Sequence, residues 1–153
     1  MAGTAPIAVA LDTSDVEEAA RWAQAVTPYV AVVKVGLELF CRTGPTAIET
    51  VRGGSGVGLF LDLKLHDIPN TVAGAARSVA RLRPSYLTVH ASGGAAMVRA
   101  AVEAAPEVTI AAVTVLTSLD QPVLDSVGLA GPPLDAVRRL AVLAVGAGAG
   151  ALV

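Results

Sequence analysis

The stretch Gly58-Leu-Phe-Leu-Asp-Leu-Lys-Leu-His-Asp-Ile-Pro-Asn-Thr71 places polar side chains at alternate positions of an apolar run. Successive side chains of a strand point to opposite faces, so the pattern predicts leucines on one face and Asp62, Lys64 and His66 on the other. Asp67 follows, where the strand gives way to a turn. An Asp-x-Lys-x-x-Asp motif at the end of so apolar a strand is costly unless its charges pair. A strand with one solvated face would show the same alternation. The other segments of the chain are therefore needed to distinguish a buried charge cluster from a solvated face.

Composition limits the class of protein. The chain has 153 residues, of which 54% are hydrophobic and 3% aromatic, and a net charge of -2. This length predicts a single domain over residues 1–153 with a core of Ala, Val, Leu and Gly. The weak negative charge argues against a nucleic-acid or anionic-membrane partner. The longest apolar run, Leu140–Val153, is Gly-rich and too short to cross a bilayer.

Cysteine usage and the first residues bear on location. Cys41 is the single cysteine, so neither an internal disulfide nor a cysteine-based metal site is expected, and Cys41 itself is expected to be inert. The segment Met1–Pro6 has no basic region before the first apolar run, so no secretory signal is expected. Together these features predict a cytoplasmic protein.

Strand-like and helix-like segments alternate along the chain. The expected strands are Ile7–Leu11, Tyr29–Val35, the run from Gly58, Tyr86–Val89, Val108–Leu116 and Ala149–Val153. The first expected helix follows a capping box of Ser14 and Glu17. Five further helices are expected: from Pro45 to about Arg52, from Ile68-Pro69 to Pro84, near Ala95–Ala104, over Gln121–Val127 and over Pro133–Val145. Such alternation predicts a parallel sheet covered by helices.

Polar residues near the carboxyl ends of the strands help to distinguish an open sheet from a barrel. They are Asp12, Lys34, Asp62 with Lys64, His90, and Thr117 with Ser118. In a (β/α)8 barrel these ends converge on one mouth, whereas an open sheet strings them along an edge. The dinucleotide motif Gly-x-Gly-x-x-Gly does not follow the first strand. A barrel is therefore predicted, although barrels usually need about 250 residues. We expect an α/β fold, a (β/α)8 TIM barrel that is incomplete and holds about strands 1–6.

The charges around Lys64 suggest its chemistry. A Schiff-base lysine must lose its proton, whereas neighbouring carboxylates hold the ammonium charged. Lys64 is therefore interpreted as a cation and general acid, which fits decarboxylation or enolate chemistry. Lys34 with Asp12 would suit polar substrate groups such as sugar hydroxyls.

At this point the chain resembles a known family. The motif Asp62-Leu-Lys-Leu-His-Asp-Ile-Pro-Asn-Thr71 is similar to the signature of the orotidine 5′-phosphate decarboxylases. Four further motifs agree in the same order: Ala-Leu-Asp12, Val-Lys34-Val-Gly-Leu-Glu-Leu-Phe, Thr-Val-His90-Ala-Ser-Gly-Gly and Val-Leu-Thr117-Ser. The resemblance extends from about Ile7 to Val153.

The resemblance implies a lyase without cofactor or metal that converts orotidine 5′-phosphate to UMP, the last step of de novo pyrimidine synthesis. Lys64 would protonate C6 of the pyrimidine within a charge network of Lys34, Asp62, Lys64 and Asp67, with Asp62 close to the substrate carboxylate. Asp12 and Lys34 would contact the ribose, and Thr117 or Ser118 the base. Asp67, Ile68 and Thr71 would complete the site of a partner subunit, which implies a homodimer with shared active sites.

The resemblance also has a limit and leaves alternatives. Members of the family continue through strands seven and eight, with a phosphate-gripping loop and a late Gly-Arg pair, so residues 1–153 alone are expected to be inactive. A Mg²⁺-dependent sugar-phosphate decarboxylase of the same superfamily shares Asp-x-Lys-x-x-Asp, although His66 and Ile68-Pro-Asn-Thr71 favour the first assignment. A non-catalytic half-barrel that only binds a nucleotide or a partner chain is the third possibility. His66 and His90 are expected to be structural. For Asp12 the simpler alternative is a helix cap, and for Thr117 and Ser118 it is a role as turn residues.

Overall fold

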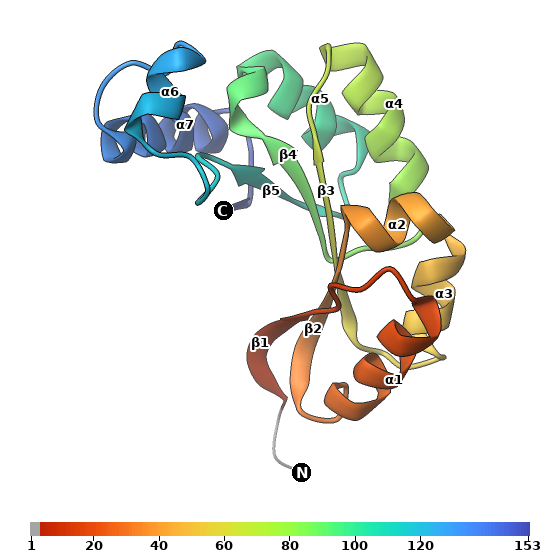
Figure 1. Cartoon of the computed structure of the whole chain (residues 1–153). Helices are drawn as coiled ribbons and strands as arrows, with labels where there is room; N and C mark the ends of the chain where they lie inside the picture. Colours follow the sequence, from red (N-terminus) through yellow and green to blue (C-terminus); the bar gives the residue numbers. More distant parts are fainter. Residues whose placement is uncertain (1–3) are drawn as a thin grey trace. The chain divides into compact units, whose positions relative to one another are not determined.

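A computed structural model describes residues 4–153, in which strands and helices alternate (Figure 1). The strands are β1 Ala5–Ala10, β2 Val30–Gly36, β3 Gly58–Leu65, β4 Tyr86–His90, β5 Thr109–Val113 and β6 Ala151–Leu152. The helices are α1 Val16–Val26, α2 Leu37–Thr43, α3 Thr46–Arg52, α4 Pro69–Ala80, α5 Ala95–Ala104, α6 Gln121–Ser126 and α7 Pro133–Gly146, with a 3-10 turn, η1, over Ala91–Gly93. The strands follow one another in the sheet in sequence order, and β1/β2, β2/β3 and β5/β6 are parallel. The predicted βα alternation is therefore confirmed.

Contacts within the chain separate two compact units, whose boundary crosses β3 after Leu63 and β4 after Leu87. The first unit holds the described residues up to Leu63 together with Val79–Leu87, and the second holds Lys64–Ser78 and Thr88–Val153. The expectation of one domain over residues 1–153 stays a prediction. Residues 1–3, on which part of the expectation about a secretory signal rests, lie outside the described residues.

In the first unit, β2 lies between β1 and β3 and sets the positions of their residues. Lys34 of β2 pairs with Ala10 of β1 and with Phe60 of β3. Helix α1 packs against α3, and α2 contacts both α3 and β2. The core of this unit is built from small and branched apolar side chains, as the composition predicts; its largest fully buried members are Leu11, Val33, Val35, Leu39, Leu59, Leu61 and Leu87.

Helix α1 begins one residue later than its sequence suggests. The predicted cap, Ser14, is replaced by Asp15, whose carboxylate accepts hydrogen bonds from the N–H groups of Glu17 at 2.9 Å and Glu18 at 3.3 Å. The hydroxyl of Thr13 in turn accepts the N–H of Asp15 at 3.1 Å. An ionised carboxylate can satisfy two free N–H groups of the first turn and also interacts favourably with the helix dipole, so Asp15 is well suited to this position.

Two details of the segment between β2 and β3 differ from expectation. Helix α2 was not predicted, because it follows β2 directly with Gly36 as a cap that has no side chain. Helix α3 begins at Thr46, so Pro45 is its cap and not its first helical residue. A Pro has a fixed φ near −65° and no N–H to satisfy, so it is tolerated at either position.

Arg52, the last residue of α3, ties this helix to the segment that follows α4. Its guanidinium donates to the carbonyl oxygens of Leu82 and Arg83, each at 2.9 Å. Burial lowers the pKa of Arg52, and the nearby positive charge of Arg83 lowers it further. Two carbonyl contacts therefore hold a partly buried cation at a position where a helix terminus also favours positive charge.

The second unit is organised around β5, whose partner β6 aligns Ala151 with Ala111 and Leu152 with Ala112. Helix α5 contacts β5, α7 and η1. β5 ends at Val113 and not at the predicted Leu116, and the chain turns further along, where the N–H of Leu119 bonds to the carbonyl of Leu116 at 3.0 Å. No helix within residues 4–153 is both long and apolar enough to cross a membrane.

Candidate active site

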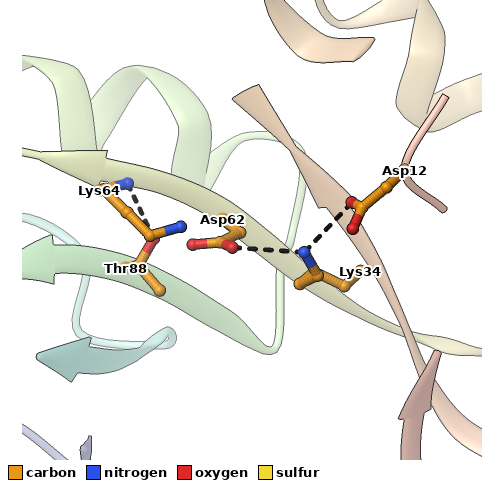
Figure 2. A network of polar contacts seen from close by, with 5 residues as sticks. All are labelled: Asp12, Lys34, Asp62, Lys64 and Thr88. Atoms are coloured by element: carbon orange, nitrogen blue, oxygen red, sulfur yellow. Dashed lines mark hydrogen bonds and ion pairs between the residues drawn. The ribbon is translucent and has the colours of Figure 1, made fainter. Parts of the chain in front are cut away.

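Lys34 lies between two carboxylates in the first unit (Figure 2). Its Nζ atom is 3.2 Å from Oδ1 of Asp12 and 3.5 Å from Oδ2 of Asp62. The side chain of Asp12 is 65% exposed, whereas those of Lys34 and Asp62 are 24% and 12% exposed. The cluster therefore runs from an open carboxylate, through a partly buried ammonium, to a buried carboxylate.

The register of the strands explains why these three residues meet. Lys34 is opposite Ala10 and Phe60, so Asp12 and Asp62 each come two residues further toward the carboxyl ends of their strands. Two residues of strand span about 6–7 Å, a distance that the flexible four-carbon stem of a lysine can cover. Lys34 thus contacts both Asp12 and Asp62, while the wider network with Lys64 and Asp67 stays a prediction.

Gly36 leaves space beside this cluster. A Cβ atom at this position would lie 3.5 Å from Oδ1 of Asp12 and 3.9 Å from Nζ of Lys34. A side chain at Gly36 would therefore lie directly beside these two charges. An ammonium that donates and carboxylates that accept suit a ligand with neighbouring hydroxyl groups, such as a sugar.

Lys64 belongs to the second unit and has an unusual backbone. Its φ is 48°, in the left-handed region, and its N–H donates to the hydroxyl of Thr88 at 2.8 Å (Figure 2). A left-handed conformation costs a residue with a side chain roughly 1–2 kcal/mol, and such residues are enriched at functional sites. The alternation predicted for this strand assumes extended backbone, which Lys64 does not have; Leu59, Leu61 and Leu63 are buried as predicted, and the shared face of Asp62 and Lys64 stays a prediction.

Asp67, Ile68 and Thr71 surround the start of α4. The N–H of Ile68 donates to the carboxylate of Asp67 at 2.6 Å, and the N–H of Thr71 to the carbonyl of Ile68 at 3.1 Å. All three residues are exposed, and Ile68, although apolar, is 65% exposed. The predicted turn at Asp67 and helix after it are confirmed, while a role of these residues in a partner's site stays a prediction.

His66 and His90 line a cavity of about 380 Å³ in the second unit. Their ring centroids are 5.3 Å apart. The other lining residues are Ser92, Thr114, Leu116, Leu119, Val127 and Leu129. Thr117 and Ser118, predicted to contact a base, are exposed in the turn after β5 and are not among these residues, whereas their neighbours Leu116 and Leu119 are. Their proposed contact with a base therefore stays a prediction.

Two buried threonines of the second unit were not recognised from the sequence as functional candidates. Thr88 is fully buried and accepts the N–H of Lys64, and Thr114 donates to the carbonyl of Val153 at 3.0 Å. Thr88 opens the motif Thr-Val-His90-Ala-Ser-Gly-Gly, but a threonine in an apolar strand is by itself a weak signal because threonine is common in strands. Within residues 4–153, no group of three or more His, Cys, Asp or Glu side chains is arranged to hold a metal ion.

A comparison with protein-family models gives a match over residues 5–152. The matching model is described as the "Orotidine 5′-phosphate decarboxylase / HUMPS family". The chain belongs to this family. The match covers nearly the whole chain and confirms the resemblance found in the five motifs.

Individual relatives agree with this family assignment. The chain is 72% identical over 149 residues to an orotidine 5′-phosphate decarboxylase of Thermobifida fusca, and the match covers 97% of the chain and 64% of the relative. A protein of the same name from Frankia casuarinae is 60% identical, with 99% of the chain and 61% of the relative covered. The chain thus spans somewhat less than two thirds of the length of these curated relatives.

Solved structures of similar proteins support the fold class. A crystal structure of orotidine 5′-phosphate decarboxylase from Lactobacillus acidophilus has a TM-score of 0.83 and 34% identity, covering 96% of the chain and 70% of that structure. An uncharacterized conserved protein from Geobacillus kaustophilus gives 0.88 and 36%, with 96% and 72% covered. With its six strands in sequence order, the chain is an incomplete (β/α)8 barrel, as predicted.

Proposed function

We propose that the chain carries the reacting residues of an orotidine 5′-phosphate decarboxylase that acts in pyrimidine nucleotide synthesis in the cytoplasm. The observation that carries the proposal is the position of Lys34 between Asp12 and Asp62, with Lys64 only two residues beyond Asp62 in β3. The family assignment and the names of the relatives add independent support.

In the proposed reaction, Asp62 faces the carboxylate that leaves and Lys64 acts as the proton donor. The bond between C6 of the pyrimidine and its carboxylate carbon breaks, CO₂ departs, and the electron pair remains on C6. A proton of the Lys64 ammonium then transfers to C6, which yields UMP and a neutral amine that regains a proton from solvent. A fixed cation next to the developing carbanion also lowers the barrier electrostatically. These steps require neither a metal nor a cofactor.

Lys34 and Asp12 bind the ribose in this proposal. The ammonium donates to one hydroxyl while the exposed carboxylate of Asp12 accepts from another, and Gly36 leaves the space for both. Thr117 or Ser118 contacts the base. Asp67, Ile68 and Thr71 act in the site of a second subunit, so the working form is a homodimer. The family resemblance supports this last point.

The test uses an extended chain, defined as residues 1–153 followed by the remaining C-terminal part of the Thermobifida fusca relative. We expect the extended chain to convert orotidine 5′-phosphate to UMP. The conversion is measured as loss of substrate absorbance and as release of CO₂. A folded extended chain that binds UMP but releases no CO₂ would contradict the proposed function and favour a binding role.

Residues 1–153 alone serve as the second arm of the test, and we expect them to be essentially inactive. In the family resemblance, the phosphate-binding residues lie beyond the matched segment. Each charge-assisted hydrogen bond to a phosphate contributes on the order of 1.5–3 kcal/mol, so losing two or three would cost roughly two to six powers of ten in rate. Binding energy from such a remote group can lower the barrier at the reacting carbon. Turnover within about tenfold of the extended chain would show that six strands hold a sufficient site.

A further inference from the structure

Thr88 of β4 makes a contact that an ordinary strand residue would not make. Its side chain is fully buried, and its hydroxyl accepts a hydrogen bond from the backbone N–H of Lys64 at 2.8 Å (Figure 2). Backbone N–H groups of a strand normally bond to a carbonyl oxygen of the neighbouring strand. Here a side-chain hydroxyl accepts the N–H of the residue proposed to donate the proton.

The backbone of Lys64 explains why a side-chain acceptor is needed. Lys64 and Arg83 are the two non-glycine residues with positive φ in the described part of the chain. At a φ of 48° the N–H of Lys64 has a different orientation relative to its own Cβ and to the chain that follows than it has in an extended strand. A buried N–H without an acceptor is strongly unfavourable, so the hydroxyl of Thr88 stabilises a conformation that the backbone would otherwise avoid.

The conformation of the backbone also decides where the lysine side chain starts. The bond from Cα to Cβ follows φ and ψ, and in extended backbone it would continue the alternation of Asp62 along β3. Its direction at Lys64 therefore depends on the left-handed φ of this residue. A lysine stem has four flexible carbons, so fixing its base removes one source of uncertainty in the position of Nζ.

We infer that Thr88 is a positioning residue for Lys64: its hydroxyl holds the left-handed backbone from which the reacting ammonium extends. This inference rests on the proposed function, because it assigns Lys64 the role of proton donor. Thr88 itself needs no contact with the substrate. The competing explanation is that Thr88 is an ordinary β-branched core residue, and in that case valine, which has the same shape, would replace it without loss.

The experiment compares Thr88→Val, which removes the hydroxyl and keeps the shape, with Thr88→Ser, which keeps the hydroxyl and removes a methyl group. In the extended chain we expect Thr88→Val to lower kcat at least thirtyfold while KM changes less than threefold. We expect Thr88→Ser to keep kcat within about threefold of the wild type. Loss of a positioned proton donor acts on the chemical step, whereas ground-state binding of substrate is retained. Val98→Ala is the control, because Val98 is also fully buried in the second unit and lies in α5.

Hydrogen exchange at the amide of Lys64, measured by NMR on residues 1–153 themselves, provides a readout that does not depend on turnover. We expect this amide to exchange at least tenfold faster in Thr88→Val than in the wild type and Thr88→Ser, relative to the amides of β5. Equal exchange rates in Thr88→Val and the wild type would show that the Thr88 hydroxyl does not hold the Lys64 backbone, which would overturn the inference. A kcat loss of Val98→Ala as large as that of Thr88→Val would overturn the positioning role. Absence of turnover in the wild-type extended chain, with normal exchange behaviour, would instead reject the proposed function and with it any role in that reaction.

Discussion

Nζ of Lys34 and Oδ2 of Asp62 lie 3.5 Å apart, although 28 residues of sequence separate the two side chains. Parallel pairing of Gly36 with Asp62 brings the carboxyl ends of β2 and β3 together and so produces this contact. Asp12 extends the same cluster from β1 at 3.2 Å. Three successive strands thus each supply one charge, an arrangement that the βα repeat makes possible because it aligns the carboxyl ends of neighbouring parallel strands.

Lys34→Met is expected to destabilise the fold, because it removes a partly buried cation between two carboxylates. Hydrogen bonds that involve charged groups contribute roughly 1.5–3 kcal/mol, so we expect a loss of that order in the free energy of unfolding measured with urea. Arg138→Met is the matched control, because Arg138 contacts Asp135 at 3.5 Å with both side chains at least half exposed. An exposed pair contributes about 0–1 kcal/mol. Equal losses in the two variants would show that the cluster contributes no more than a surface pair.

Gly58→Ala is expected to destabilise the first unit by about 1–3 kcal/mol, because β3 passes close to two neighbours at this position. A Cβ atom there would lie 2.9 Å from the carbonyl oxygen of Ala31 and 3.1 Å from the hydroxyl of Ser85. The control is Gly74→Ala in α4, where a Cβ atom meets nothing within 4 Å. Alanine favours a helix over glycine by about 0.5–1 kcal/mol, so thermal melts should move in opposite directions for the two variants. An unchanged melting temperature for Gly58→Ala would contradict the close approach.

Shared active sites predict that two inactive variants of the extended chain restore activity when mixed. Lys64→Ala supplies an intact Asp67, and Asp67→Ala supplies an intact Lys64, so each heterodimer assembles one complete site. With equal amounts and free exchange of subunits in a two-fold dimer, about a quarter of the wild-type activity should return. A mixture that remains inactive, although mass spectrometry detects the heterodimer, would place both residues in the same subunit's site.

Turnover by the extended chain is expected to remain within about twofold of its starting value after dialysis against EDTA, because Lys64 supplies the positive charge and the proton. The assay follows orotidine 5′-phosphate absorbance before dialysis, after dialysis, and after Mg²⁺ is added back. Activity that disappears with EDTA and returns with Mg²⁺ would favour the metal-dependent sugar-phosphate decarboxylases of the same superfamily.

The sequence was sufficient for the order of the six strands and of every helix except α2, because short apolar runs alternate with segments of helical period along the chain. Ala95–Ala104 was predicted at the bounds that the structure has, and the carboxyl ends of the first three strands correctly located Asp12, Lys34 and Asp62. Helix α2 was missed because a strand passes into it at Gly36, without the polar turn that usually marks a boundary.

Other features depend on tertiary structure and leave little trace in the sequence. A left-handed backbone at a lysine is maintained by its surroundings, here by the hydroxyl of Thr88, 24 residues further along the chain. Likewise, Asp15 and Ser14 are both good caps, and only the path of the chain after Leu11 decides between them.

Lys64→Ala in the extended chain tests the central claim most directly, because this ammonium is proposed to supply the proton that replaces CO₂. Decarboxylation would be measured as the formation of UMP. Calorimetric titration with UMP would show whether the variant keeps its fold and its binding site. We predict that UMP still binds with an affinity within about tenfold of the wild type while turnover falls by at least about three powers of ten. Retention of a tenth or more of the wild-type rate would contradict the assignment of Lys64 as the proton donor.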